Sequence, residues 1–284
     1  MKKLSFLLIA LLALAGCASS GIEPVSNELL FSINGKEIKE ADIFDAMKLS
    51  SGSVGIVQDK AQKMLLKEIV EEDEAFDKKV QEVLQEAKDL MGDNFELTLK
   101  QNGFENEDEY VEKIIKDIVR QSFALTKVMG DDYEALKSKR PRKVKVLEVK
   151  ATDGKKVLEL LKAGESFETL DKEYGQDTSY YHGDEILVSE ISDMDTSILN
   201  ALLGKEETGI VESVQASSKG ETAYVGEVTN IDEDALKDEA IESFINNSKL
   251  TKEYMGRLFV EHNFKLYDQD LYDAYLQNYP EFIK

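Results

Sequence analysis

The chain has 284 residues, of which 57 are acidic and 35 basic, so its formal net charge at pH 7 is −22. A surface of this sign repels nucleic-acid phosphates and anionic lipid headgroups, which argues against a nucleic-acid-binding protein. The single cysteine excludes an intramolecular disulfide, so packing alone must hold the fold together.

The N-terminus has the pattern of a secretory signal. Two lysines precede an apolar run over residues 6–15 that is too short for a permanent membrane span. The run closes on Leu-Ala-Gly-Cys, ending at Cys17, and this motif resembles the lipobox of bacterial lipoproteins. The resemblance implies a signal peptide over 1–16 and lipid attachment at Cys17, which would anchor an exported protein at the extracytoplasmic face of a membrane. The alternative is an ordinary cleaved signal with an incidental cysteine.

The next segments predict a tether, a hairpin and helices. Small polar residues over 17–28 are typical of a flexible tether. Two short strands follow, joined by Asn34-Gly35, a strong hairpin signal, and then a helix that reaches Met47. Apolar residues at spacings of three, four and seven predict one long helix from the serine- and glycine-rich stretch at 50–55 to about Met91.

A second helix is predicted over about 107–129. After it the composition changes from mainly acidic to basic. Six basic residues lie between 137 and 145, beside one of only three prolines. We interpret this stretch as a domain boundary. It is either a solvated linker or a contact for an anionic wall polymer or lipid headgroups.

Short mixed elements are predicted from there to residue 230. They comprise a strand near 144–149, two short helices, and strands near 208–214 and 222–229. Beyond Asp232 the helical pattern returns. The tail concentrates aromatic residues, which we interpret either as a client-binding surface or as packing onto the tail's own domain. These residues are Tyr267, Tyr272, Tyr275, Tyr279 and Phe282.

Two stretches carry a family resemblance. Residues 27–47, NELLFSINGKEIKEADIFDAM, resemble the opening of PrsA/SurA-type extracytoplasmic foldases. Residues 157–179, VLELLKAGESFETLDKEYGQDTS, resemble the two-helix stretch of parvulin-type peptidyl-prolyl isomerase domains. Their matching positions are Leu161, Gly164, Phe167, Leu170, Tyr174 and Asp177.

The resemblance implies an α+β fold with a mainly helical chaperone domain. Its N-terminal part would span 29–138 and its C-terminal part 231–284. A parvulin-like domain with a small antiparallel sheet would be inserted between them over 142–230.

The resemblance also implies a site, and this sequence departs from it. Parvulins have two histidines that face each other across the central strands. Val146 or Leu147 takes the place of the first histidine, and Tyr224 that of the second. Since a tyrosine does not titrate near neutral pH, we expect isomerase activity to be absent or weak.

The rest of the predicted site is degenerate. The acid position is retained as Asp177, while Met194 and Ile198 take the places of pocket-wall residues. Without the histidines, Asp177 is better interpreted as a turn residue and the other two as core residues. The two histidines of the chain, His182 and His262, form no metal-ligand pattern, so no metal is expected.

These observations favour a membrane-anchored, ATP-independent foldase or chaperone for unfolded or partly folded secreted proteins, with a Gram-positive host preferred. No phosphate-binding glycine-rich loop is present, so neither a nucleotide nor another cofactor is expected. Two alternatives remain open. One is an active prolyl isomerase that relies on Tyr224 and Asp177. The other is a solute-binding lipoprotein of a transporter, which would need alternating strand and helix units in two lobes.

Overall fold

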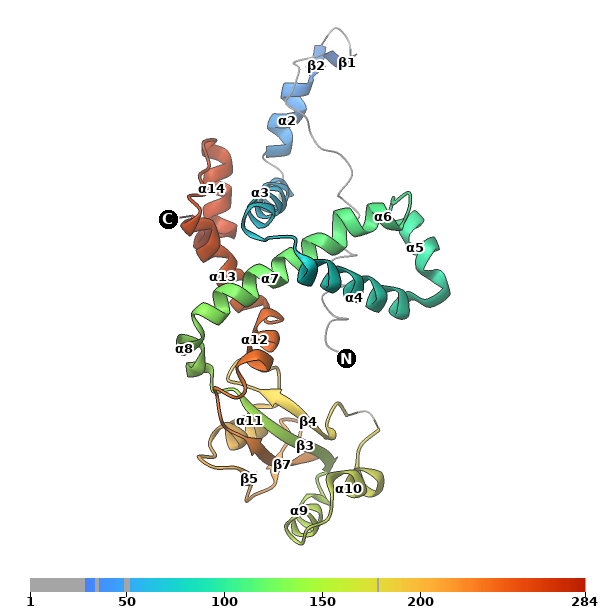
Figure 1. Cartoon of the computed structure of the whole chain (residues 1–284), viewed down its shortest axis with the longest axis vertical. Coiled ribbons are helices and arrows are strands. Elements are labelled where there is room, and N and C mark those ends of the chain that lie inside the picture. The colour runs from blue at the N-terminus through green and yellow to red at the C-terminus, as the bar shows by residue number, and fades with distance from the viewer. Residues whose placement is uncertain (1–28, 34–35, 49–51, 178, 284) are drawn as a thin grey trace. The chain divides into compact units, whose positions relative to one another are not determined.

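A computed structural model describes residues 29–33, 36–48, 52–177 and 179–283 (Figure 1). The chain divides into two compact units. The helical unit combines residues 1–127 with 248–284, and the sheet unit consists of 128–247. The predicted signal peptide, Cys17 and the tether lie outside the described residues, as does the Asn34-Gly35 turn. Within the described ranges, every helix is too short or too polar to cross a bilayer.

The helical unit opens with the expected hairpin. Strands β1 (Leu29–Ile33) and β2 (Lys36–Lys39) pair antiparallel, with Ser32 opposite Glu37. The helices of the N-terminal segment then follow in order: α2 (Glu40–Lys48), α3 (Ser53–Ile69), α4 (Glu74–Met91), α5 (Phe95–Gln101) and α6 (Glu107–Tyr110). Helix α6 continues through a π-helical stretch (Val111–Ile115) into α7 (Lys116–Asp131), which confirms the helix expected near 107–129.

The prediction of one uninterrupted helix up to Met91 is wrong, because the chain breaks between α3 and α4. Val70 has extended backbone angles and ends α3. Asp73 then starts a new helix, since its side chain accepts a hydrogen bond from the backbone nitrogen of Phe76 at 2.9 Å. Gly92 ends α4 with a positive φ of 54°, a conformation that glycine adopts easily.

The core of the helical unit fills the space between α4, α5 and the α6–α7 helix. Tyr110 is fully buried in this core, where its ring meets Phe95 and Phe104 edge-on at centroid distances of 6.0 and 5.3 Å. The other buried members of the cluster are apolar: Phe76, Val80, Val83, Leu84, Ala87, Leu99, Ile114, Ile115, Ile118 and Val119.

One buried cation ties the start of α4 to α7. Arg120 is 4% exposed, and its Nε donates to Glu72 Oε1 at 3.0 Å while Nη1 donates to Asp117 Oδ1 at 2.6 Å. The hydrogen bond from Arg120 lowers the pKa of Glu72. Burial raises the pKa of Asp117 despite the nearby Lys63 and Arg120. The guanidinium thus holds two carboxylates from separate segments.

The C-terminal segment packs its aromatic residues into one another. It forms α13 (Ser248–Glu261), α14 (Gln269–Asn278) and a short 3₁₀ turn (Pro280–Phe282). Tyr275 is fully buried, and its ring contacts those of Phe264, Tyr279 and Phe282 in tilted or edge-on arrangements. Its hydroxyl donates a hydrogen bond to Gln58 on α3. This contact joins the C-terminal segment to the N-terminal helices within the helical unit.

The sheet unit is built on a five-stranded antiparallel sheet of order β4-β3-β7-β5, with β6 also paired to β7. Its strands are β3 (Arg142–Lys150), β4 (His182–Val188), β5 (Gly209–Ile210), β6 (Gln215–Ala216) and β7 (Thr222–Asn230). Its helices are α8 (Tyr133–Leu136), with a 3₁₀ turn at Lys137–Lys139, then α9 (Gly154–Lys162), α10 (Phe167–Tyr174), α11 (Thr196–Leu203) and α12 (Lys237–Ile245).

Helices cover both faces of this sheet. Leu147, Val149 and Val225 pack with the buried residues of α9 and α10, where Gly164 ends the first helix at a φ of 97°. Val144 and Val146 pack on the opposite face with α11. The α+β fold class is therefore confirmed, with a mainly helical part and a small antiparallel sheet. The antiparallel pairing gives no support to the two-lobed solute-binding alternative.

The sequence analysis missed β4, which interrupts the stretch between the two short helices and α11. The predicted domain limits at 138, 142 and 230 lie inside the sheet unit, which also contains α8 and α12. Tyr133 on α8, for instance, donates its hydroxyl to the backbone oxygen of Glu233 at 2.5 Å.

Candidate functional site

The α11 face of the sheet brings together three of the four predicted site residues. Tyr224 lies on β7, Ile198 lies on α11, and Met194 precedes that helix; all three belong to one apolar cluster. Ile198 is fully buried and Tyr224 is 7% exposed. Asp177 is an exposed residue beyond the end of α10 and is not part of this cluster.

The register of β3 decides which residue stands opposite Tyr224 on this face. Val146 belongs to the α11 cluster, whereas Leu147 points to the α9–α10 side. Of the two positions left open by the sequence, Val146 therefore shares a face with Tyr224. Val146 pairs with Gly226 on β7, and a side chain at Gly226 would meet Ile198 Cδ1 at 3.2 Å. Apolar side chains thus fill the space around Val146.

Glu148 is the acidic residue nearest to Tyr224, and the sequence analysis did not single it out. It stands directly opposite Tyr224 in the β3–β7 register. Its carboxylate accepts hydrogen bonds from the hydroxyls of Ser179 and Thr222, both at 2.6 Å. The alternation of a strand places residue 148 on the same face as 144 and 146, and this signal could have found it.

The environment of Tyr224 keeps its phenol neutral. Burial, followed by the negative charges of Glu148 and Asp195, raises the pKa of Tyr224 to about 12. Its ring meets Tyr181 edge-on at a centroid distance of 5.9 Å. A phenol with this pKa can donate a hydrogen bond near pH 7, but it stays protonated there and does not titrate.

His182 lies on the other side of the sheet from Val146 and Tyr224. It pairs with Leu147, the residue that points toward α9 and α10. Its Nδ1 lies 2.9 Å from Asp171 Oδ1 on α10, and its Nε2 lies 2.9 Å from the backbone oxygen of Ser179. The hydrogen bond to Asp171 is the main cause that raises the pKa of His182. In the described part of the chain, no group of three or more metal-ligating side chains is close enough to hold a metal ion.

Three of the six basic residues of segment 137–145 pair with carboxylates of their own unit. Lys137 contacts Glu134 and Asp234, Lys143 contacts Glu185 and Glu239, and Arg142 contacts Glu233. Part of the segment is strand β3, and Arg142 is only 8% exposed, so the description as a solvated linker is wrong. These internal ion pairs also leave less positive charge for a wall polymer or a lipid surface.

The aromatic tail divides into buried and exposed members. Tyr275 and Phe282 are 0% and 3% exposed, so they pack within the helical unit. Tyr267 is 92% exposed and is the tail aromatic most open to solvent. The helical unit also exposes apolar side chains on α3 and α5, including Met64 at 73% and Leu97 at 55%.

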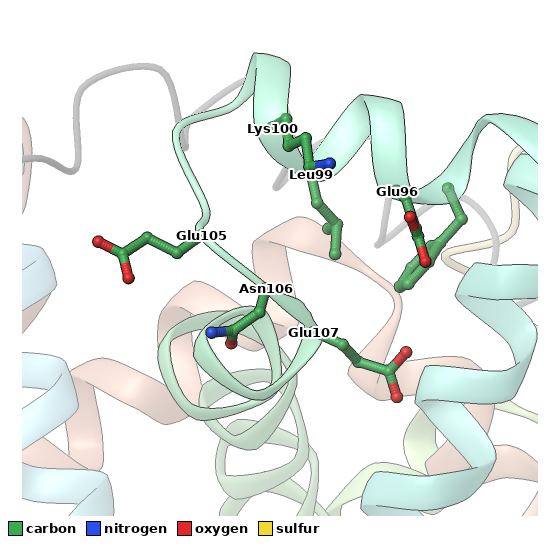
Figure 2. Close-up of a pocket in the computed structure, with 7 residues that line it drawn as sticks. Glu96, Leu99, Lys100, Glu105, Asn106 and Glu107 are labelled. Carbon is green, nitrogen blue, oxygen red and sulfur yellow. The ribbon is translucent and has the colours of Figure 1, made fainter.

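A pocket of about 330 Å³ lies in the helical unit between α5 and the chain that enters α6 (Figure 2). Phe95 and Leu99 supply its apolar lining. The polar lining comes from Glu96, Lys100, Glu105, Asn106 and Glu107. No feature of the sequence pointed to this pocket, because its two sides come from segments that are separated by the turn at Gly103.

Comparison with known proteins supports the PrsA-type resemblance. No family model matches the chain. Foldase protein PrsA 3 of Bacillus anthracis is 33% identical over 170 residues, which is 59% of this chain and 55% of that protein. Foldase protein PrsA of Bacillus subtilis (strain 168) is 25% identical over 291 residues, which is 97% of this chain and 94% of that protein.

One solved structure that is similar to this chain is the crystal structure of foldase protein PrsA from Streptococcus pneumoniae str. Canada MDR_19A. It is 20% identical with a TM-score of 0.49, and the match covers 88% of this chain and 99% of that one. The more identical Bacillus anthracis relative is matched over only 55% of its length.

Proposed function

We propose that this protein is a PrsA-type foldase that acts as an ATP-independent chaperone on unfolded or partly folded secreted proteins. Its similarity to proteins named foldase protein PrsA, at 33% identity over part and 25% over nearly all of the chain, supports this function. Exposed apolar side chains on α3 and α5, such as Met64 and Leu97, offer contacts for clients that have not yet buried their own apolar segments.

We further propose that prolyl isomerase activity is weak or lost. The observation that carries this proposal is the apolar composition of the α11 face, to which Val146 and Tyr224 belong. The sequence resemblance predicts histidines at these two positions. Rotation about a prolyl bond faces a barrier of about 18–20 kcal/mol, and catalysis needs polar groups aimed at the twisted amide. A valine that is 1% exposed offers no such group.

Anchoring at the membrane is a proposal from the sequence alone. The Leu-Ala-Gly-Cys motif at Cys17 supports acylation of the exported chain, which would keep the chaperone at the membrane where clients emerge. Incorporation of labelled palmitate, compared with a Cys17→Ser variant, tests this directly. Equal labelling of the two proteins would contradict the anchor.

An active isomerase remains the second candidate, and the Tyr224–Glu148 pair favours it. Tyr224 could donate a hydrogen bond to a substrate carbonyl, while Glu148 is held in place by Ser179 and Thr222. In this case Asp177, exposed and outside the cluster, takes no part.

A refolding experiment separates the two candidates. A model protein whose refolding is limited by prolyl isomerisation is mixed with catalytic amounts of this protein, and aggregation of a second client is followed with stoichiometric amounts. We expect no acceleration of refolding but clear suppression of aggregation. Acceleration that Tyr224→Phe or Glu148→Gln abolishes, with Asp177→Asn as the matched control, would establish the active isomerase instead.

A further inference from the structure

The pocket between α5 and α6 has a firm apolar floor. Phe95 and Leu99 line it and are 7% and 3% exposed, so other side chains already hold them in place. Figure 2 shows Leu99 directed from α5 toward the segment that carries Asn106. A volume of about 330 Å³ is at the lower end of the range for ligand pockets, about 300–1,000 Å³, and so suits a side chain rather than a large ligand.

Local hydrogen bonds hold the opposite wall of the pocket. The side chain of Asn106 accepts a hydrogen bond from the backbone nitrogen of Glu109 at 2.9 Å and caps α6. The carboxylate of Glu109 in turn accepts from the backbone nitrogen of Glu105 at 2.6 Å. Phe95 rests on the buried ring of Tyr110. The pocket is therefore formed before any ligand arrives, which lowers the entropic cost of binding.

The charges at the rim determine which segment the pocket favours. In Figure 2, Glu96 and Glu107 lie on one side of Leu99 and Glu105 on the other. Glu107 pairs with Lys88 at 2.7 Å. Glu96 and Glu105 are exposed, and no cation in the described ranges lies within ion-pairing distance of either. Lys100 is the one rim cation, also exposed and without a carboxylate partner among the described residues.

Two free carboxylates against one free ammonium make the rim acidic, and the net charge of −22 adds a field of the same sign. We propose that this pocket binds one apolar side chain of an unfolded client segment, with a lysine or arginine of the same segment placed at Glu96. The inference rests on the proposed chaperone function and specifies which client segments the helical unit selects.

Binding of a short fluorescent peptide, followed by anisotropy, tests this inference. The peptide carries one leucine flanked by a lysine on each side, and control peptides replace the leucine with serine or the lysines with glutamates. We expect the parent peptide to bind, and both replacements to weaken binding. The protein is used as the full chain, and aggregation of an unfolded client is measured on the same preparation.

Charge variants at the rim give the residue-level test. Glu96→Lys should weaken binding of the lysine-flanked peptide about fivefold, since it replaces an attraction with a repulsion. Lys100→Glu should strengthen binding about twofold, because it replaces the one cation of the rim with a further carboxylate. Glu86→Lys is the matched control because Glu86 is exposed on α4, outside the pocket, and has no ion-pair partner in the described chain. It should change binding little.

Three results would overturn the inference. The first is an equal loss of peptide affinity in Glu96→Lys and Glu86→Lys, because the long-range effect of net charge would then explain the whole change. The second is undiminished binding of the serine or glutamate peptide. The third is absence of peptide binding by a protein that still suppresses aggregation, which would leave the chaperone function standing. Loss of aggregation suppression itself would instead contradict the proposed function.

Discussion

The two units place their buried charges in different surroundings. In the helical unit, a guanidinium that is 4% exposed joins α7 to the start of α4 through Glu72 and Asp117. In the sheet unit, apolar layers cover both faces of the sheet, and the buried Arg142, the first residue of β3, pairs with Glu233. Polar contacts of the sheet unit lie near strand ends. Glu148, near the end of β3, accepts hydrogen bonds from the hydroxyls of Ser179 and Thr222.

The apolar layers explain how the sheet unit can keep its fold with Val146 and Tyr224 on its α11 face. A sheet that is held by apolar volume on both faces does not depend on the polar residues of its site. In the helical unit the paired charge joins two separate segments, and a lone buried carboxylate or guanidinium there would be costly.

The largest effect is expected for Ile198→Ala in the sheet unit. Ile198 is fully buried against the sheet and would contact a side chain at Gly226, so its truncation leaves a cavity beneath α11. We expect a loss of about 3–4 kcal/mol in the free energy of unfolding. Urea unfolding measures this loss, and hydrogen exchange locates it.

The matched control for this cavity is Asn200→Ala on the exposed side of the same helix, which should cost less than about 0.5 kcal/mol. A loss below about 1 kcal/mol for Ile198→Ala would show that apolar volume does not hold the sheet unit.

The next effect is expected for Arg120→Ala in the helical unit. Removal of the guanidinium leaves Glu72 and Asp117 without their common partner, and it also removes a cation placed over the Phe76 ring. Breaking a fully buried pair costs about 3–5 kcal/mol. The two carboxylates here are 32% and 21% exposed, so we expect a smaller loss of about 2–3 kcal/mol.

The control for the charge is Lys79→Ala, which removes the surface ion pair with Glu82 and should cost about 0.5 kcal/mol or less. Equal losses for the two variants in urea unfolding would contradict a special role for the buried cation.

Much of the fold could be predicted from local sequence patterns. Short stretches of sequence are enough to predict these features, which include the amphipathic spacing in α4, the capping position of Gly92 and the alternation in β3. The break after Val70 was missed because apolar spacing continues across it, while the capping bond of Asp73 depends on a side-chain position. Strand β4 was missed because its pairing with β3 is a long-range contact.

The candidate site could be predicted only in part, for a similar reason. The resemblance placed Tyr224, Met194 and Ile198, and the structure brings these three together. It also placed Asp177, which lies outside the cluster, and it overlooked Glu148. A residue-by-residue resemblance follows chain position, whereas the neighbour of Tyr224 is set by the register between β3 and β7. The pocket at α5 needs two segments to meet and leaves no linear signal.

A smaller effect of opposite sign is expected for Tyr110→Phe. The hydroxyl of Tyr110 is buried and has no hydrogen-bond partner in the described structure, and burial raises the pKa of this phenol to about 12. Removing an unpaired buried hydroxyl relieves its desolvation cost while the ring contacts with Phe95 and Phe104 remain. We expect a gain of about 1 kcal/mol in urea unfolding.

The control for Tyr110 is Tyr133→Phe, which removes a hydroxyl that does donate, to Glu233, and which should cost about 1 kcal/mol. Destabilisation by Tyr110→Phe would show that its hydroxyl does find a partner.

The smallest effect is a pH dependence in the sheet unit that comes from His182. The hydrogen bond to Asp171 raises the pKa of His182 above the ordinary value of 6.5, so the folded state holds this proton more tightly than the unfolded chain does. The resulting stabilisation is complete below pH 6.5 and is lost as the pH rises through the folded-state pKa. Because the His182 side chain is 38% exposed, solvent screens the pair, and we expect at most about 0.5 kcal/mol.

The midpoint of urea unfolding, measured between pH 5.5 and 8.5, reports this loss. The range extends from about one unit below to about two units above the ordinary histidine pKa. Asp171→Asn should flatten the profile, since it removes the charge that favours the protonated ring, while a matched change at exposed His262, to Asn, should leave the profile intact. A profile that Asp171→Asn leaves unchanged would assign the pH dependence to other groups. The His182–Asp171 pair would then contribute no measurable stability to the sheet unit, and the contrast between the two units would be larger.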